Sequence, residues 1–234
     1  MKYLRLIVGV VNALCLVVLL FALSIQTPAL GVWFYRYQFN KNGTYDVLRM
    51  DEENLHYVAR NWISYLSGKR ETLADTAAIV NGRERLFFNE LELSHMDDVL
   101  VLFGYGLTGR NVAAAGFVVT LIILLLSDRK HSREKAAYQL LGLWRGFAAG
   151  CLTAFAVLGG LIALDFSRAF NIFHEIFFVD NWRFDARTSL MINMLPNGFF
   201  VDAAAFIIIM FVSLMVLTVI ISTALRRIIK KHAG

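Results

Sequence analysis

The chain has 234 residues, of which 58% are hydrophobic, and its mean hydropathy is +0.58. This composition excludes an ordinary soluble globular domain and is typical of a small integral membrane protein. The net charge of +5 and the pI of about 9.3 do not require a nucleic-acid partner, because basic residues also set membrane topology and contact anionic lipids.

Four runs without a charged side chain predict membrane spans. Each is long enough to cross about 30 Å of hydrocarbon when tilt and interfacial ends are allowed for. The uncharged runs cover residues 6–25, 111–127, 146–164 and 203–225, and the predicted spans cover 6–25, 108–127, 146–165 and 203–225. We therefore predict a mainly α-helical membrane protein with a single domain over 1–234 and two long loops, 28–108 and 166–202.

The distribution of lysine and arginine predicts the orientation of these spans. The N-terminus, the connection between the second and third spans, and the C-terminal tail together hold eleven cations and two anions. The two long loops and their flanks hold twelve cations and sixteen anions. By the positive-inside rule, both termini are cytoplasmic and both long loops are extracytoplasmic.

The first span could be a secretory signal peptide, because a basic start precedes it and Ala22-Leu23-Ser24 offers a small-x-small pattern. Its apolar run is longer than the usual signal-peptide core, so an uncleaved anchor is the better interpretation. The two cysteines, Cys15 and Cys151, fall within the first and third spans. We expect both to pack as small apolar residues, with no external disulfide framework.

The first long loop begins with a signal for a β-hairpin. Tyr35, Tyr37 and Phe39 alternate with polar residues, and Asn42-Gly43 follows before a second alternating run. An Asn-Gly pair between alternating segments is a strong short-range hairpin signal. The sequence therefore predicts a small β-ribbon at this point of the loop.

An amphipathic helix is predicted next, ending near Gly68. Its apolar residues recur at helical spacing and are Leu55, Val58, Ala59, Trp62 and Leu66. A second Asn-Gly pair, Asn81-Gly82, separates two short apolar runs and gives a weaker hairpin signal.

His95 precedes the second span in a segment with carboxylates on both sides. On a helix, Glu92 and Asp98 lie three residues either side of His95 and share its face. A carboxylate there could hold one imidazole nitrogen and raise the basicity of the other, as a general base needs. An exposed histidine in an acidic, solvated helix start explains this segment equally well.

His174 precedes the fourth span among aromatic residues. Helical spacing surrounds it with Phe170, Phe177 and Phe178, which belong at the membrane interface. A histidine there is costly unless it is hydrogen-bonded or functional, which favours a functional role. The aromatic residues themselves suit an interfacial belt better than a ligand cage, although a lipid substrate could use the same surface.

Three segments resemble the bacterial lipoprotein intramolecular transacylase family. They are ELSHMDDV at 92–99, FHEIFFVDNWRFD at 173–185 and LPNGFFVD at 195–202, on a four-span frame. The resemblance implies that His95 and His174 are catalytic. Other motif positions are Glu92, Asp98, Asp180, Trp182, Asp185, Pro196 and Asp202, and the supporting or substrate-binding residues we expect are Glu92, Asp98, Phe173, Glu175, Phe177, Trp182 and Asp185. Where the family more often has aspartate-proline, this chain has Asp185-Ala186.

The resemblance also implies the reaction. The family moves the sn-2 acyl chain of a diacylglyceryl-cysteine lipoprotein to the α-amine of that cysteine, which leaves an N-acyl S-monoacylglyceryl lyso-form. We accordingly expect an acyltransferase in the bacterial cell membrane with its site on the extracytoplasmic face, lipoprotein and membrane lipid as partners, and no cofactor. Ser94 is a poor nucleophile for His95, since adjacent helical residues point about 100° apart.

Three other classes of protein remain as alternatives. A metal-dependent membrane hydrolase could use both histidines with Glu92, Asp98 or Glu175, but HxxxH, HExxH and cysteine ligand spacings are absent. A bis-histidine haem protein would place its ligands midway along facing spans. A non-enzymatic transporter would place ionisable or helix-breaking residues near the bilayer centre, where these spans offer only Asn12 and several glycines.

Overall fold

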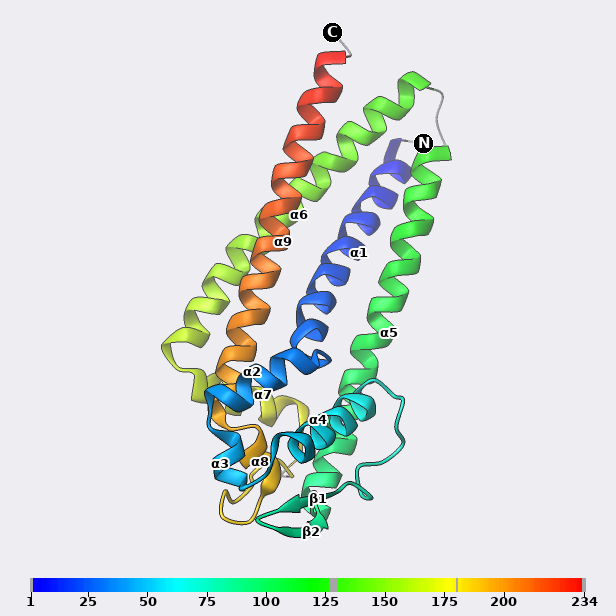
Figure 1. The fold of residues 1–234 in the computed structure, drawn as a ribbon. Coiled ribbons are helices and arrows are strands. Elements are labelled where there is room, and N and C mark those ends of the chain that lie inside the picture. Colours follow the sequence, from blue (N-terminus) through cyan, green and yellow to red (C-terminus); the bar gives the residue numbers. More distant parts are fainter. Residues whose placement is uncertain (1, 127–129, 180, 233–234) are drawn as a thin grey trace. The chain divides into compact units, whose positions relative to one another are not determined.

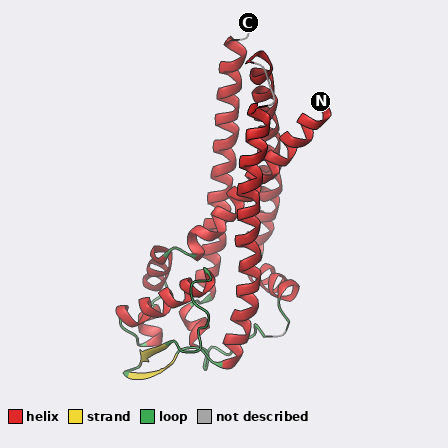
Figure 2. Cartoon of the chain, turned by 90° about the vertical axis from the view of Figure 1, so that its right-hand side faces the viewer, coloured by secondary structure: helices red, strands yellow, loops and turns green. Residues whose placement is uncertain are grey.

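The computed structural model describes residues 2–126, 130–179 and 181–232, and it is mainly helical with one small hairpin (Figures 1 and 2). The predicted fold class is confirmed. Elements in chain order are α1 (Lys2–Ala29), α2 (Val32–Lys41), α3 (Thr44–Leu48), α4 (Glu52–Leu66), β1 (Ala77–Val80), β2 (Arg83–Leu86), α5 (Glu90–Leu126), α6 (Lys130–Leu164), α7 (Phe166–Phe177), α8 (Leu190–Met194) and α9 (Asn197–His232).

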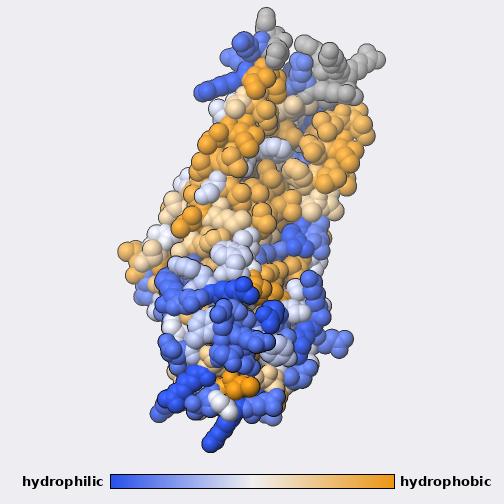
Figure 3. All heavy atoms as spheres, viewed as in Figure 1, coloured by the Kyte–Doolittle hydropathy of each residue, from blue (hydrophilic) through white to orange (hydrophobic). Residues whose placement is uncertain are grey.

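Four helices are long and apolar enough to cross a membrane. They extend over Tyr3–Ala29, Glu90–Leu126, Glu134–Leu164 and Asn197–Lys231, and they contain the predicted spans apart from residues at the ends of two. Hydrophobic side chains cover the visible face of these long helices, as expected for contact with lipid (Figure 3). The chain divides into two compact units, 1–24 with 107–161 and 208–234, and 25–106 with 162–207. The single domain over 1–234 stays a prediction.

The first unit packs parts of α1, α5, α6 and α9 around one polar group and one aromatic group. The fully buried Asn12 amide donates to the Phe117 carbonyl at 3.0 Å and to Thr120 Oγ1 at 2.9 Å, and its Oδ1 accepts from Trp144 Nε1 at 3.0 Å. Such bonds between helices satisfy a polar side chain for which lipid hydrocarbon offers no hydrogen-bond partner. Phe21, Phe155 and Phe211 pack as an edge-to-face and tilted cluster, with centroids 4.4–5.6 Å apart.

The second unit has the larger apolar core, built from α2, α4, the hairpin, and parts of α5, α8 and α9. Phe39, Leu55, Val58 and Met194 are fully buried within it. The predicted amphipathic helix is confirmed as α4, whose N-cap Asp51 accepts from Asn54 N. The chain leaves α4 at Gly68, which has a positive φ of 71° that favours glycine.

The hairpin predicted at Asn42-Gly43 is wrong. Residues 32–41 form α2, with Phe34, Tyr35, Gln38 and Phe39 buried at helical spacing. Tyr37 is exposed, so the apparent alternation did not correspond to two faces of a strand. Gly43 instead adopts φ 63° in the turn between α2 and α3.

The second Asn-Gly pair forms the hairpin. Strand β1 pairs antiparallel with β2, and Val80 lies opposite Arg83 across the turn. Asn81 and Gly82 have φ values of 52° and 73°, the two positive values that a type I′ turn requires.

A buried carboxylate joins the start of α5 to α8. Glu92 is fully buried; it accepts from Asn89 N at 2.8 Å and from Met191 N at 3.3 Å, and it accepts a short hydrogen bond from Ser189 Oγ. Asn89 Oδ1 in turn accepts from Glu92 N at 3.0 Å, which completes a reciprocal helix cap. Since α5 carries His95 one turn later, this group helps to position that histidine.

We expect Glu92→Ala to destabilise the second unit by about 2–5 kcal/mol, because it leaves the Ser189 hydroxyl and the Met191 N–H buried without an acceptor and removes the cap on Asn89 N. The midpoint of thermal unfolding in detergent, followed by circular dichroism, would measure the loss. Glu175→Ala is the matched control, because Glu175 is exposed and forms only a 3.6 Å ion pair with Arg183. Equal midpoints for the two variants would contradict the role of Glu92.

Candidate active site

The structure brings the two predicted histidines together. His95 lies on the second turn of α5, and His174 lies on the last turn of α7. Their rings are nearly parallel, at 21°, with centroids 6.0 Å apart, and the residues are only 6% and 9% exposed. Both helices have capped starts, since Asp165 accepts from Arg168 N at the start of α7 and Asn89 and Glu92 cap the start of α5.

The hydrogen bond of His174 determines which nitrogen is free. Its Nδ1 lies 2.8 Å from the carbonyl oxygen of Phe170 one turn earlier. A carbonyl only accepts, so Nδ1 carries the proton and donates it. In the neutral ring Nε2 then keeps its lone pair, which is the arrangement that a general base needs.

Burial holds His174 in this neutral form. The ring lies outside the membrane-spanning helices, and its burial lowers the pKa below the usual 6.5, while the bond to the Phe170 carbonyl opposes the shift. At pH 7 the imidazole is therefore uncharged and able to accept a proton.

Aromatic side chains enclose both imidazoles. The centroids of Phe170 and Trp182 lie 4.0 and 4.9 Å from the His174 ring. Phe178 contacts both histidines, at 4.7 Å from His95 and 5.3 Å from His174, and Phe184 lies 5.5 Å from His95. Aromatic groups near the histidines thus form the wall of the candidate site, although the sequence favoured an interfacial belt.

Asn181 interacts both with His95 and with a carboxylate. Its Nδ2 donates to Asp98 Oδ2 at 2.7 Å and lies 3.4 Å from Ser94 Oγ. Its Oδ1 and the Nδ1 of His95 are both buried without a hydrogen-bond partner in the described part of the chain, and the two side chains interact. A hydrogen bond from His95 Nδ1 to Asn181 Oδ1 would complete an Asp98–Asn181–His95 chain. Sequence reasoning missed Asn181, although it precedes Trp182 within the aromatic motif.

The other predicted supporting residues lie in different settings. Glu92 makes its hydrogen bonds to the caps of α5 and α8, and Asp98 accepts from Asn181 and acts on His95 through its charge. Glu175 pairs with Arg183, and Asp185 accepts from Arg187. Phe173 and Phe177 are half-exposed on α7 beside the site, with Phe173 5.5 Å from His174. Of the remaining motif positions, Asp202 accepts from Gln38 at 2.8 Å, Pro196 precedes α9, and Asp180 lies outside the described residues.

Across residues 2–126, 130–179 and 181–232, no three His, Cys, Asp or Glu side chains gather in a way that could hold a metal ion. The groups that the site offers for chemistry are two imidazoles, an amide and a hydroxyl in an apolar surrounding. Such a set suits proton transfer to and from a bound substrate.

The chain is similar in fold to solved structures of a bacterial membrane protein. The chain is similar to the membrane integral lipoprotein intramolecular transacylase Lit from Bacillus cereus, with a TM-score of 0.80, 20% identity and full coverage of both chains. Two variants of that protein with a mutated histidine are also similar, both at 21% identity. The alanine variant gives a TM-score of 0.70 and the match covers 100% of this chain and 97% of that one. The arginine variant gives a TM-score of 0.68 and the match covers 99% of this chain and 94% of that one. These likenesses establish the fold.

Membership of a family rests on the sequence itself. No curated protein matches the chain significantly. A family model described as lipoprotein intramolecular transacylase Lit matches residues 10–200, which is most of the chain. The chain therefore belongs to the lipoprotein intramolecular transacylase Lit family, and it is an integral membrane acyltransferase.

Proposed function

We propose that this enzyme moves the sn-2 acyl chain of a diacylglyceryl-cysteine lipoprotein to the α-amine of the same cysteine, with His95 and His174 as acid and base. The observation that supports the proposal is the pair of buried imidazoles, 6.0 Å apart, one of which has a free Nε2. Both come from segments that carry the family resemblance.

The reaction balances without a cofactor. The neutral amine attacks the sn-2 ester carbonyl, a C–N bond forms, and the C–O bond to glycerol breaks. One histidine takes the proton from nitrogen, and a histidine returns a proton to the departing alkoxide. The amine attacks through an eight-membered ring that a flexible lipid seldom visits, and holding that geometry can supply on the order of 7–11 kcal/mol.

His174 is the histidine we assign beside the lipid, and His95 is its partner. The aromatic wall of Phe170, Phe178 and Trp182 suits an acyl chain next to His174. Asn181 interacts with His95 and donates to Asp98, which is exposed to water and favours a positive charge on the His95 ring, although burial lowers the pKa of that imidazole. Asn181 acts through His95 and is a positioning residue.

The reaction predicts a product with the mass of the substrate. Pure enzyme should convert a diacylglyceryl lipopeptide, without nucleotide or added phospholipid, into a lipopeptide of equal mass whose α-amine is acylated. His95→Ala and His174→Ala should each lower turnover by about 10²- to 10⁴-fold while the protein still folds. Tandem mass spectrometry of the lipopeptide would locate the moved chain.

His131→Ala is the matched control and should keep full turnover, because His131 belongs to the predicted cytoplasmic connection. His56 is a poorer control, since it is buried and its Nε2 lies 3.0 Å from Tyr45 Oη. The intramolecular reaction would be refuted if the lipopeptide gained the mass of one acyl group from labelled phospholipid. It would also be refuted if the lipopeptide lost one acyl group by hydrolysis. Loss of turnover in Ser94→Ala would indicate an acyl-enzyme instead of direct transfer.

A positioning role for Asn181 predicts a specific kinetic pattern. Asn181→Ala should lower kcat by about 10- to 100-fold with little change in KM, because the orientation of His95 is lost while the aromatic wall remains. In a His95→Ala background the same change should have almost no further effect. Asn171→Ala, at an exposed asparagine of α7, is the control. Additive losses in the double variant would show that Asn181 does not act through His95.

We also propose that both termini are cytoplasmic and that the segments carrying the two histidines are extracytoplasmic, from the distribution of cations. An impermeant thiol reagent on intact cells should then label Lys69→Cys and Arg183→Cys but not Lys135→Cys, all at exposed positions, in a chain lacking Cys15 and Cys151. The reverse pattern would place the site on the cytoplasmic face and contradict the proposed substrate.

A further inference from the structure

The first unit contains a strongly basic hollow of about 250 Å³ between α6 and α9. The residues that line it are Tyr138 and Arg145 of α6, and Thr223, Arg226, Arg227 and Lys230 of α9. Four of these six are cations and none is acidic. Among the described residues, no ion pair joins these cations to a carboxylate. Within the described part of the chain, the hollow therefore concentrates positive charge that no carboxylate pairs with.

One of these cations is held in place by the surrounding chain. The guanidinium carbon of Arg226 lies 4.0 Å from the centre of the Tyr138 ring. Its Nη1 also packs against Gly142, because a Cβ added to that glycine would lie only 2.8 Å from Nη1. Arg226 is thus packed against α6, although arginines near a membrane more often extend freely into water.

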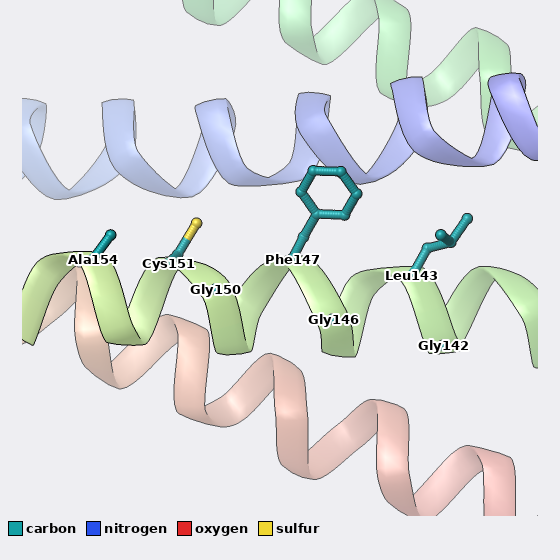
Figure 4. Close-up of a pocket in the computed structure, with 7 residues that line it drawn as sticks. All are labelled: Gly142, Leu143, Gly146, Phe147, Gly150, Cys151 and Ala154. Atoms are coloured by element: carbon teal, nitrogen blue, oxygen red, sulfur yellow. The ribbon is translucent and has the colours of Figure 1, made fainter.

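An apolar groove begins at the same glycine. It has a volume of about 490 Å³ and is lined by Gly142, Leu143, Gly146, Phe147, Gly150, Cys151 and Ala154 along α6 (Figure 4). Leu143, Phe147 and Cys151 project from the same side of the helix in this view. Gly146 and Gly150 have open space where a Cβ would be. Gly142 therefore contacts the basic hollow through Arg226 and lines the apolar groove.

We propose that this combined site binds an anionic phospholipid, with its phosphate headgroup in the basic hollow and an acyl chain along the α6 groove. Basic pockets between membrane helices recognise such headgroups, and each lysine or arginine near an anionic lipid surface contributes on the order of 1 kcal/mol. A free polyanion would need only the cations, whereas the adjoining groove matches a molecule with both charge and hydrocarbon. The lipid is a bound partner and is distinct from the lipoprotein substrate proposed above.

Lipid binding to the purified full chain in detergent tests this proposal, by titration with phosphatidylglycerol and phosphatidylcholine in native mass spectrometry. Phosphatidylglycerol should bind more tightly than phosphatidylcholine. The double variant Arg226→Gln with Lys230→Gln should weaken the affinity for phosphatidylglycerol about 30-fold. The matched control is Lys135→Gln with Lys231→Gln, which removes two exposed cations from the same helices outside the hollow. The unfolding midpoint without lipid shows whether each variant is folded.

A second variant tests the groove. At Gly150 a Cβ would have no neighbouring atom within 4 Å outside the adjoining backbone of its own helix. Gly150→Leu should therefore place its side chain in the groove and weaken the binding of long-chain phosphatidylglycerol, while the binding of a short-chain analogue stays unchanged. Equal binding of the two lipids, equal loss in the control pair, or full competition by inorganic phosphate would overturn the proposal. Because the readout is lipid binding, its failure is separate from a failure of the transacylase reaction.

Discussion

The carboxylate of Glu92 is the group on which the arrangement of the second unit depends. A fully buried carboxylate is stable only when its oxygens are hydrogen-bonded, and here the donors come from the start of α5 and from the start of α8. The group therefore fixes the first turn of α5, and His95 follows on the next. In this enzyme Glu92 contributes to the site by holding a helix in place, which differs from the direct contact with imidazole that the sequence suggested.

The apolar surrounding of the histidines affects both their base strength and their protonation state in the proposed reaction. Burial lowers the pKa of His174, so the ring is a weaker base but is present in its neutral form. The reference pKa of an α-amine, about 7.7 to 8.0, lies above that of histidine, about 6.5, so a lowered pKa of His174 makes proton transfer from the attacking amine less favourable. Orientation of the amine towards the ester can supply on the order of 7–11 kcal/mol, and this contribution does not depend on the strength of the base.

The sequence predicted the long helices correctly and singled out two histidines that lie side by side in the structure. It failed where tertiary packing chooses between local patterns. Uncharged runs of about 20 residues have few alternatives to a membrane helix. The segment around Tyr35 and Phe39 fits either a strand or a helix, and its buried residues selected the helix. Asn181 could not be recognised because its relation to Asp98 exists only after α5 and the segment following α7 come together.

Asn12 makes the assembly of the membrane helices dependent on their order in the chain. Each hydrogen bond of its side chain in the described structure crosses to α5 or α6. Those helices are synthesised after α1 and after the whole of the long loop between them. An inserted α1 therefore carries an amide without its final partners until the second and third spans arrive. The helix that starts the chain is completed by segments more than a hundred residues later.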